Sequence, residues 1–153
     1  MFGEVNKRRK YDSARRRDQA RATREAIVDA ARRLFLSDGF GSTTVAAIAG
    51  EVGVSVDTIY KGFGGKAGLV RAICDAALAG QGPVHAEDRS DALHGPDTDP
   101  RDIIRGWRVL MTEVAPRISP ILLLMRDAAR TDPELADVRA DVDRQRLARM
   151  TQN

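Results

Sequence analysis

The residues that could support covalent or metal chemistry are few and poorly spaced for it. His85 lies close to Glu87 and Asp88, but this spacing fits no zinc pattern, and the surrounding acidic stretch predicts a solvated loop. The run GFGGK at residues 62–66 resembles a phosphate-binding loop only superficially, because it follows an expected helix and lacks the required spacing. The single cysteine, Cys74, lies on an apolar helical stretch and is expected to be a buried hydrophobe. The sequence therefore predicts no enzyme, metal site or cofactor.

A different pattern occupies residues 48–60, which read IAGEVGVSVDTIY. Gly53 supplies a residue that is comfortable at positive φ, and the small Ala49 lets two helices approach closely. Ser55 can cap a second helix and bond one of its free amides. Apolar residues are spaced to point into the crease between the helices: Ile48, Val52, Val54 and Ile59. The stretch predicts a helix-turn-helix, in which a short turn joins two helices at a steep angle.

In a helix-turn-helix the second helix lies in the DNA major groove, with its N-terminal residues against the base edges. Val56 can contact a thymine methyl group, while Asp57 either accepts from a cytosine amino group or favours the helix N-terminus through the dipole. Thr43 or Thr44 begins the preceding helix, where amides and hydroxyls suit a phosphate. Lys66 begins the following helix and either reaches the DNA backbone or stays solvated. The predicted DNA contacts are Thr43, Thr44, Ser55, Val56, Asp57, Thr58, Tyr60, Lys61 and Lys66.

Helical periodicity surrounds this motif and strand alternation is absent, so we predict an all-α fold. Expected helices cover residues 23–38, 45–50, 55–63 and 66–79, and Gly68 is expected to weaken the last of these. The stretch 80–100 holds three prolines and three glycines and predicts a loop, with room for one helical turn. A helix then follows Pro100 and ends at Pro116. Further helices are expected to begin at Ser119-Pro120 and at about Pro133.

Charge is distributed unevenly along the chain. Residues 1–24 hold nine Lys and Arg against three Asp and Glu, a net charge of +6, whereas the whole chain has a net charge of +3. A basic segment of this kind either binds nucleic acid or forms a solvated tail. Lacking an apolar period, residues 1–20 are expected to form a flexible arm, with room for helix towards its end. The single cysteine and the lack of a long apolar run predict a cytoplasmic protein with no membrane partner.

Residues 23–73 resemble the signature of the TetR family of bacterial transcriptional repressors. The resemblance is carried by Gly39-Phe40, Thr43-Thr44-Val45, Ile48-Ala49, Gly53-Val54-Ser55, Thr58-Ile59-Tyr60, Phe63, Lys66 and Leu69. It implies a DNA-binding domain over residues 21–65 and a helical regulatory and dimerisation domain over 66–153. It also implies a homodimeric repressor that binds double-stranded DNA and is released from its operator by a small-molecule effector.

Two expectations concern the C-terminal half. An effector pocket is expected to be lined by Ile73, Ile104, Trp107, Met111, Leu122 and Met125, although each is also an ordinary core position. The regulatory domain is expected to be incomplete, because members of the family normally have two more long helices. The apolar stripe Leu135, Val138, Val142, Leu147 and Met150 then either pairs with a partner chain or packs on residues 103–128. The alternative function is a truncated interaction module that pairs with a full-length regulator and binds DNA weakly alone.

Overall fold

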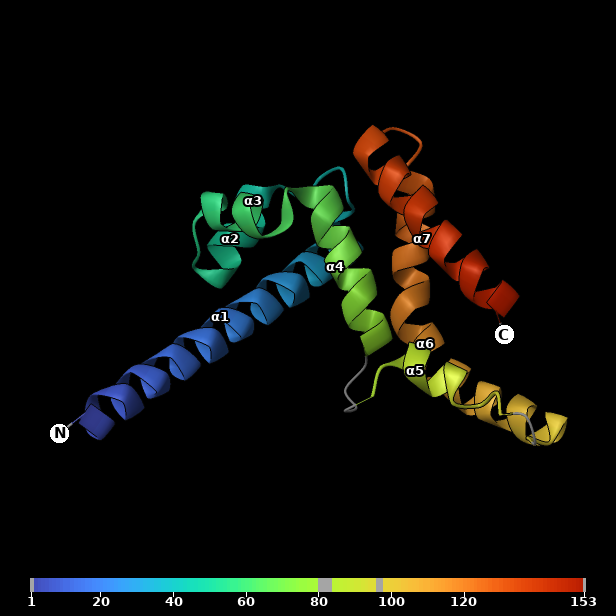
Figure 1. Ribbon diagram of the computed structural model, residues 1–153. Helices are drawn as coiled ribbons and strands as arrows, with labels where there is room; N and C mark the ends of the chain where they lie inside the picture. The colour runs from blue at the N-terminus through green and yellow to red at the C-terminus, as the bar shows by residue number, and fades with distance from the viewer. Residues whose placement is uncertain (1, 80–83, 96–97, 153) are drawn as a thin grey trace.

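The structure is a computed structural model that describes residues 2–79, 84–95 and 98–152. Within these residues it contains seven helices and no strand, which confirms the all-α prediction. The helices are α1 (Phe2–Asp38), α2 (Val45–Val52), α3 (Val56–Phe63), α4 (Lys66–Ala79), α5 (Ala86–Asp91), α6 (Pro100–Ala128) and α7 (Pro133–Gln152). In Figure 1, α2 and α3 lie beside the long α1, and α4 connects this group to α5, α6 and α7. Within the described residues, no helix combines the length and apolar character needed to cross a bilayer.

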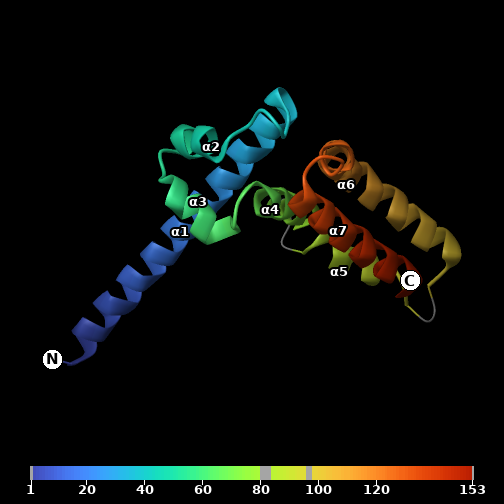
Figure 2. The same cartoon turned by 90° about the horizontal axis from the view of Figure 1, so that it is seen from above.

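α1 corrects the expectation of a flexible arm over residues 1–20, because the helix already begins at Phe2. Residues 4–38 contain neither glycine nor proline and are rich in Arg and Ala, which are among the best helix formers. Arg21 also pairs with Asp18 at 3.4 Å and lies 3.9 Å from Glu25, and pairs at this spacing support a helix. The sequence pattern did not reveal this helix because it depends on residue propensity and not on an apolar face. Figures 1 and 2 show this part of α1 projecting beyond the rest of the molecule.

One hydrophobic core joins the two halves of the described chain. It includes Phe35 of α1, Ile48 of α2, Ile59 of α3 and Ile73 of α4, all at most 2% exposed. The same cluster continues through Ile121 and Met125 of α6 to Leu135 of α7. Cys74 is buried in this cluster, as expected, and its Sγ lies 3.6 Å from Met125 Sδ. Burial, reinforced by Asp75, raises the pKa of the Cys74 thiol to about 12, so it remains protonated.

α6 is one continuous helix through Pro116 and Pro120, so the expected end at Pro116 and new start at Ser119 are wrong. A proline inside a helix costs about 3 kcal/mol. The buried stripe Leu110, Val114, Ile121 and Met125 keeps one helical register across both prolines. Burial of each of these side chains contributes about 1.5–3 kcal/mol, so the stripe offsets the cost. Figure 1 shows α6 changing direction along its length, as expected for a helix that contains prolines.

The apolar stripe of α7 packs against the core in its first half and is exposed further along the helix, at Leu147. Leu135 is fully buried, and Val138 and Val142 pack against the same core as α6. The interpretation that the stripe packs within the chain therefore holds for its first half. Leu147 is 64% exposed, and the side chain of Met150 lies outside the described residues. In the 80–100 stretch, the expected single helical turn corresponds to α5.

Candidate nucleic-acid interface

The turn between α2 and α3 has the predicted chemistry. Thr44 is the N-cap of α2, and its hydroxyl accepts from the Ala47 N–H at 3.0 Å. Gly53 ends the helix with φ of 74°, a left-handed conformation that favours glycine. Ser55 then caps α3, its hydroxyl accepting from the Thr58 N–H at 3.1 Å. The glycine therefore turns the chain, and the serine starts the next helix at a new angle.

α3 has one buried and one exposed face. Ile59 is fully buried, whereas Val56 is 40% and Tyr60 is 53% exposed. Lys61 Nζ lies 2.7 Å from the Asp57 carboxylate on the exposed face. Asp57 and Lys61 are one helical turn apart, and Asp57 lies in the first turn of α3. Both facts fit a helix-stabilising role for Asp57. The structure thus brings Ser55, Val56, Asp57, Thr58, Tyr60 and Lys61 together on one exposed surface, which we call the α3 surface.

Thr43 does not belong to this surface, which corrects its assignment as a DNA contact. It is 3% exposed, and its hydroxyl lies 2.9 Å from the Gly39 carbonyl and 3.1 Å from the Leu34 carbonyl. The last carbonyls of a helix have no partner within the helix, and Thr43 supplies one at the end of α1. Its neighbour Thr44 remains exposed at the N-terminus of α2.

Lys66 is directed toward the α1–α2 connection. Its ammonium donates to the Phe40 carbonyl and lies 4.2 Å from the centre of the Phe40 ring. Burial lowers the pKa of the Lys66 ammonium, and the nearby Asp132 carboxylate opposes this shift. Lys66 therefore ties α4 to the end of α1, and its contact with DNA stays a prediction.

A second cation–aromatic contact, at the C-terminal end of α3, was not anticipated from the sequence. Arg24 of α1 donates to the Gly62 carbonyl at 3.1 Å, and its guanidinium lies 4.3 Å from the centre of the Phe63 ring. A cation over an aromatic face is attracted by the ring quadrupole. Arg24 and Phe63 are 39 positions apart, so no local pattern could pair them. The contact fixes α3 against the α1 helix.

The expected effector pocket is not assembled. Ile73 and Met125 are at most 1% exposed in the core, while Ile104 is 70% and Met111 is 41% exposed. Leu122 and Trp107 are half-buried, and Trp107 packs edge-on against His94 at 6.5 Å. Ile104, Trp107 and Met111 share one apolar stripe of α6, but the buried residues of the helix form a separate stripe beside it. Apolar periodicity showed that α6 is amphipathic without showing which part of its wide apolar face is covered.

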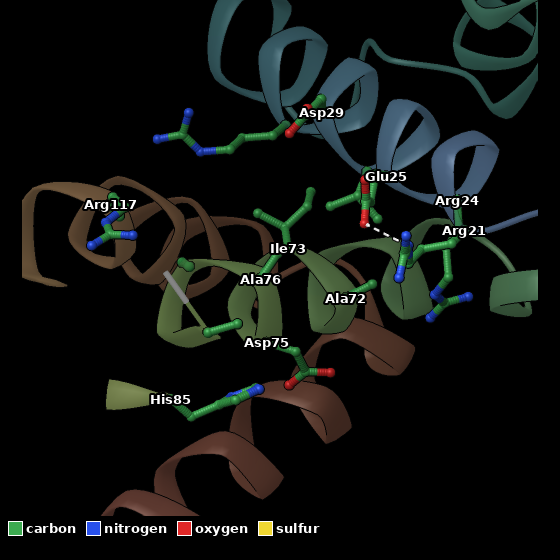
Figure 3. A pocket seen from close by; sticks show the side chains of 14 residues that line it. Arg21, Arg24, Glu25, Asp29, Ala72, Ile73, Asp75, Ala76, His85 and Arg117 are labelled. Atoms are coloured by element: carbon green, nitrogen blue, oxygen red, sulfur yellow. Dashed lines mark ion pairs between the residues drawn. The ribbon is translucent and has the colours of Figure 1, made fainter. Parts of the chain in front are cut away.

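A separate cleft lies where α1, α4 and α6 meet. It has a volume of about 690 Å³ and a floor of small apolar side chains from α4, including Ala72, Ile73 and Ala76. Figure 3 shows Asp29 of α1 and Arg117 of α6 around this floor. Of the six predicted pocket residues, the cleft includes only Ile73.

Sequence comparisons find relatives of this chain among known regulatory proteins. The family described as bacterial regulatory proteins, tetR family, matches residues 27–73. The chain is 28% identical over 109 residues to the HTH-type transcriptional regulator YvkB of Bacillus subtilis, covering 71% of this chain and 54% of YvkB. It is 42% identical over 62 residues to the HTH-type transcriptional regulator TtgR of Pseudomonas putida, covering 40% of this chain and 30% of TtgR.

A solved structure from Shewanella sp. PV-4, described as a tetR family transcription regulator, is 21% identical to this chain. The match covers 85% of this chain and 90% of the Shewanella chain, with a TM-score of 0.31. Over residues 27–73, which include the helix-turn-helix, the chain is similar to the TetR family of regulatory proteins. It spans about half the length of YvkB and less than a third of TtgR.

Proposed function

We propose that this chain is a sequence-specific DNA-binding transcriptional regulator that acts as a repressor. The observation that carries the proposal is the α3 surface, a capped helix whose polar N-terminal side chains are exposed while Ile59 anchors its other face. A helix presented in this way fits the DNA major groove. The basic N-terminal part of α1, residues 2–24, which we call the α1 extension, adds charge that favours phosphate.

Two further steps belong to the same proposal. A homodimer would place two α3 surfaces on two half-sites, and a small-molecule effector would release the operator by moving α4. The cleft beside α4 supports the second step, because a ligand seated on Ala72 and Ala76 would contact α1 and α4 together. TtgR and YvkB are both described as HTH-type transcriptional regulators, which supports the DNA-binding step only.

The test is selection of duplex DNA from a random pool, followed by titration of the selected site by fluorescence anisotropy. We expect Tyr60→Ala to weaken binding about tenfold, as loss of an exposed contact worth roughly 1–2 kcal/mol would. Leu36→Ala is the matched control, because Leu36 is 40% exposed but lies on α1 outside the α3 surface. A chain that enriches no sequence, or a Tyr60 variant that binds like the Leu36 variant, would refute the proposal.

A second candidate is an interaction module that binds DNA weakly until it pairs with a longer regulator. Exposed apolar side chains on α6 favour it, since Ile104 is 70%, Val109 is 57% and Leu123 is 52% exposed. Surfaces of this kind often mark protein contacts. Light scattering after size exclusion separates the two candidates: a dimer that binds the selected site supports the repressor, and a monomer that binds it only weakly supports the module.

A further inference from the structure

α3 has few side chains that can read bases through paired hydrogen bonds. The helix VDTIYKGF contains no Arg, Asn or Gln, the residues that bond guanine or adenine in a bidentate way. Lys61 and Asp57 could each contact a base, but they already pair with each other at 2.7 Å. Direct recognition of guanine or cytosine by this helix would first have to break that pair.

The two hydroxyl groups at the start of α3 are also engaged. Ser55 Oγ accepts from the Thr58 N–H at 3.1 Å and lies 2.8 Å from Thr58 Oγ1. These contacts cap the helix, so both hydroxyls already have hydrogen-bond partners within the protein. A hydroxyl can also bond any of several base edges or a phosphate, which gives it little discrimination.

The N-terminal end of α3 is the part of the helix that meets the bases. Of its exposed side chains, Val56 is the one not engaged in the contacts described above. It is the first residue of α3 and is 40% exposed, although its side chain is purely aliphatic. The only apolar group that a base pair offers in the major groove is the thymine 5-methyl. We propose that Val56 is a specificity-determining residue that recognises the 5-methyl group of a thymine in each half-site. This inference rests on the proposed DNA-binding function and names the base that the function requires.

The test replaces thymines of the selected site by deoxyuridine, one base pair at a time in both half-sites, which removes only the methyl group. For the natural chain we expect one substitution to weaken binding about fourfold per half-site, the contribution of burying one carbon group. Val56→Ala should weaken binding to the thymine site and abolish the difference between thymine and deoxyuridine at that position. Leu36→Ala, which removes an equally exposed aliphatic group elsewhere, should keep the difference.

The outcomes separate a failure of this inference from a failure of the proposed DNA-binding function. If no duplex is bound selectively, the proposed function fails and the inference fails with it. If the site is bound but every deoxyuridine substitution is neutral, or the effect survives unchanged in Val56→Ala, DNA binding stands and Val56 does not read thymine. Melting curves of Val56→Ala and the natural chain must coincide, and Val56→Thr, which retains one methyl group, should preserve part of the thymine preference.

Discussion

Replacing Gly68 by alanine tests how α3 is joined to α4. Gly68 lies in the first turn of α4, and a Cβ atom built there would overlap the Phe63 carbonyl oxygen and lie 2.9 Å from its carbonyl carbon. Both are backbone atoms, so no rotamer change can relieve the overlap. The glycine is therefore required by the close approach of the end of α3 to α4, which the sequence interpretation treated only as a weakness in the helix.

The two effects on stability have opposite signs. Helix propensity alone predicts that alanine stabilises α4 by about 1 kcal/mol relative to glycine. Forcing an extra carbon into a packed region costs about 1–3 kcal/mol, and more where backbone must move. We expect the overlap to dominate, with a net loss of about 1–3 kcal/mol and a fall in Tm of roughly 2–10 °C for a chain of this length.

The assay is thermal and urea unfolding followed by circular dichroism, with Gly62→Ala as the matched control. Gly62 is also helical, but nothing lies within 4 Å of a Cβ built there. Gly62→Ala should therefore leave stability unchanged or raise it by up to about 1 kcal/mol. A Gly68→Ala chain as stable as Gly62→Ala would refute the steric argument. It would show that the joint between α3 and α4 can shift without cost.

The α1 extension, Thr43 and Glu113 each give a further test. Deleting residues 1–18 should flatten the slope of log affinity against log salt by about one unit for each phosphate that the extension neutralises, and an unchanged slope in anisotropy titrations would show that the α1 extension does not touch phosphate. Thr43→Val should cost about 1–2 kcal/mol in urea unfolding, because the carbonyls of Leu34 and Gly39 lose a buried hydroxyl donor. Hydrogen bonds from Arg89 and Arg117 lower the pKa of Glu113 to about 2, so Glu113→Gln should lower Tm above pH 4.5. The difference from the natural chain should vanish as the pH falls toward 2, and a difference independent of pH would contradict this assignment.

The sequence predicted the helix-turn-helix well because its determinants are local. Gly53 and Ser55 act within one turn of their own positions, and their conformations follow from residue type. The bounds of α4 were also predicted, since the glycines at 64 and 65 stop α3 immediately before it. Exposure of the α3 surface follows in the same way, because Ile59 fixes which face is buried.

The errors arise where a distant contact decides the outcome. Pro116 is a helix terminator by local rules, yet the buried positions Val114 and Ile121 on either side of it keep α6 continuous. By residue type alone Thr43 could bind a phosphate. In the fold, its hydroxyl instead contacts carbonyls at the end of α1. Ile104 belongs to an amphipathic pattern, but only tertiary packing shows that its stripe of α6 is not covered.

α4 is the element through which the C-terminal helices can influence the α3 surface. It packs against α1, α3, α5, α6 and α7. At its start, the close approach of Gly68 to the Phe63 carbonyl and the Lys66 contact with Phe40 hold it to both ends of the α2–α3 region. Further along, Arg71 pairs with Asp141 of α7, and Ile73 lies in the core shared with α6. Because Gly68 lies directly against the Phe63 backbone, we expect a displacement of α4 by α6 or α7 to move the end of α3 as well. A ligand that displaces α4 would therefore act on the α3 surface through backbone contact.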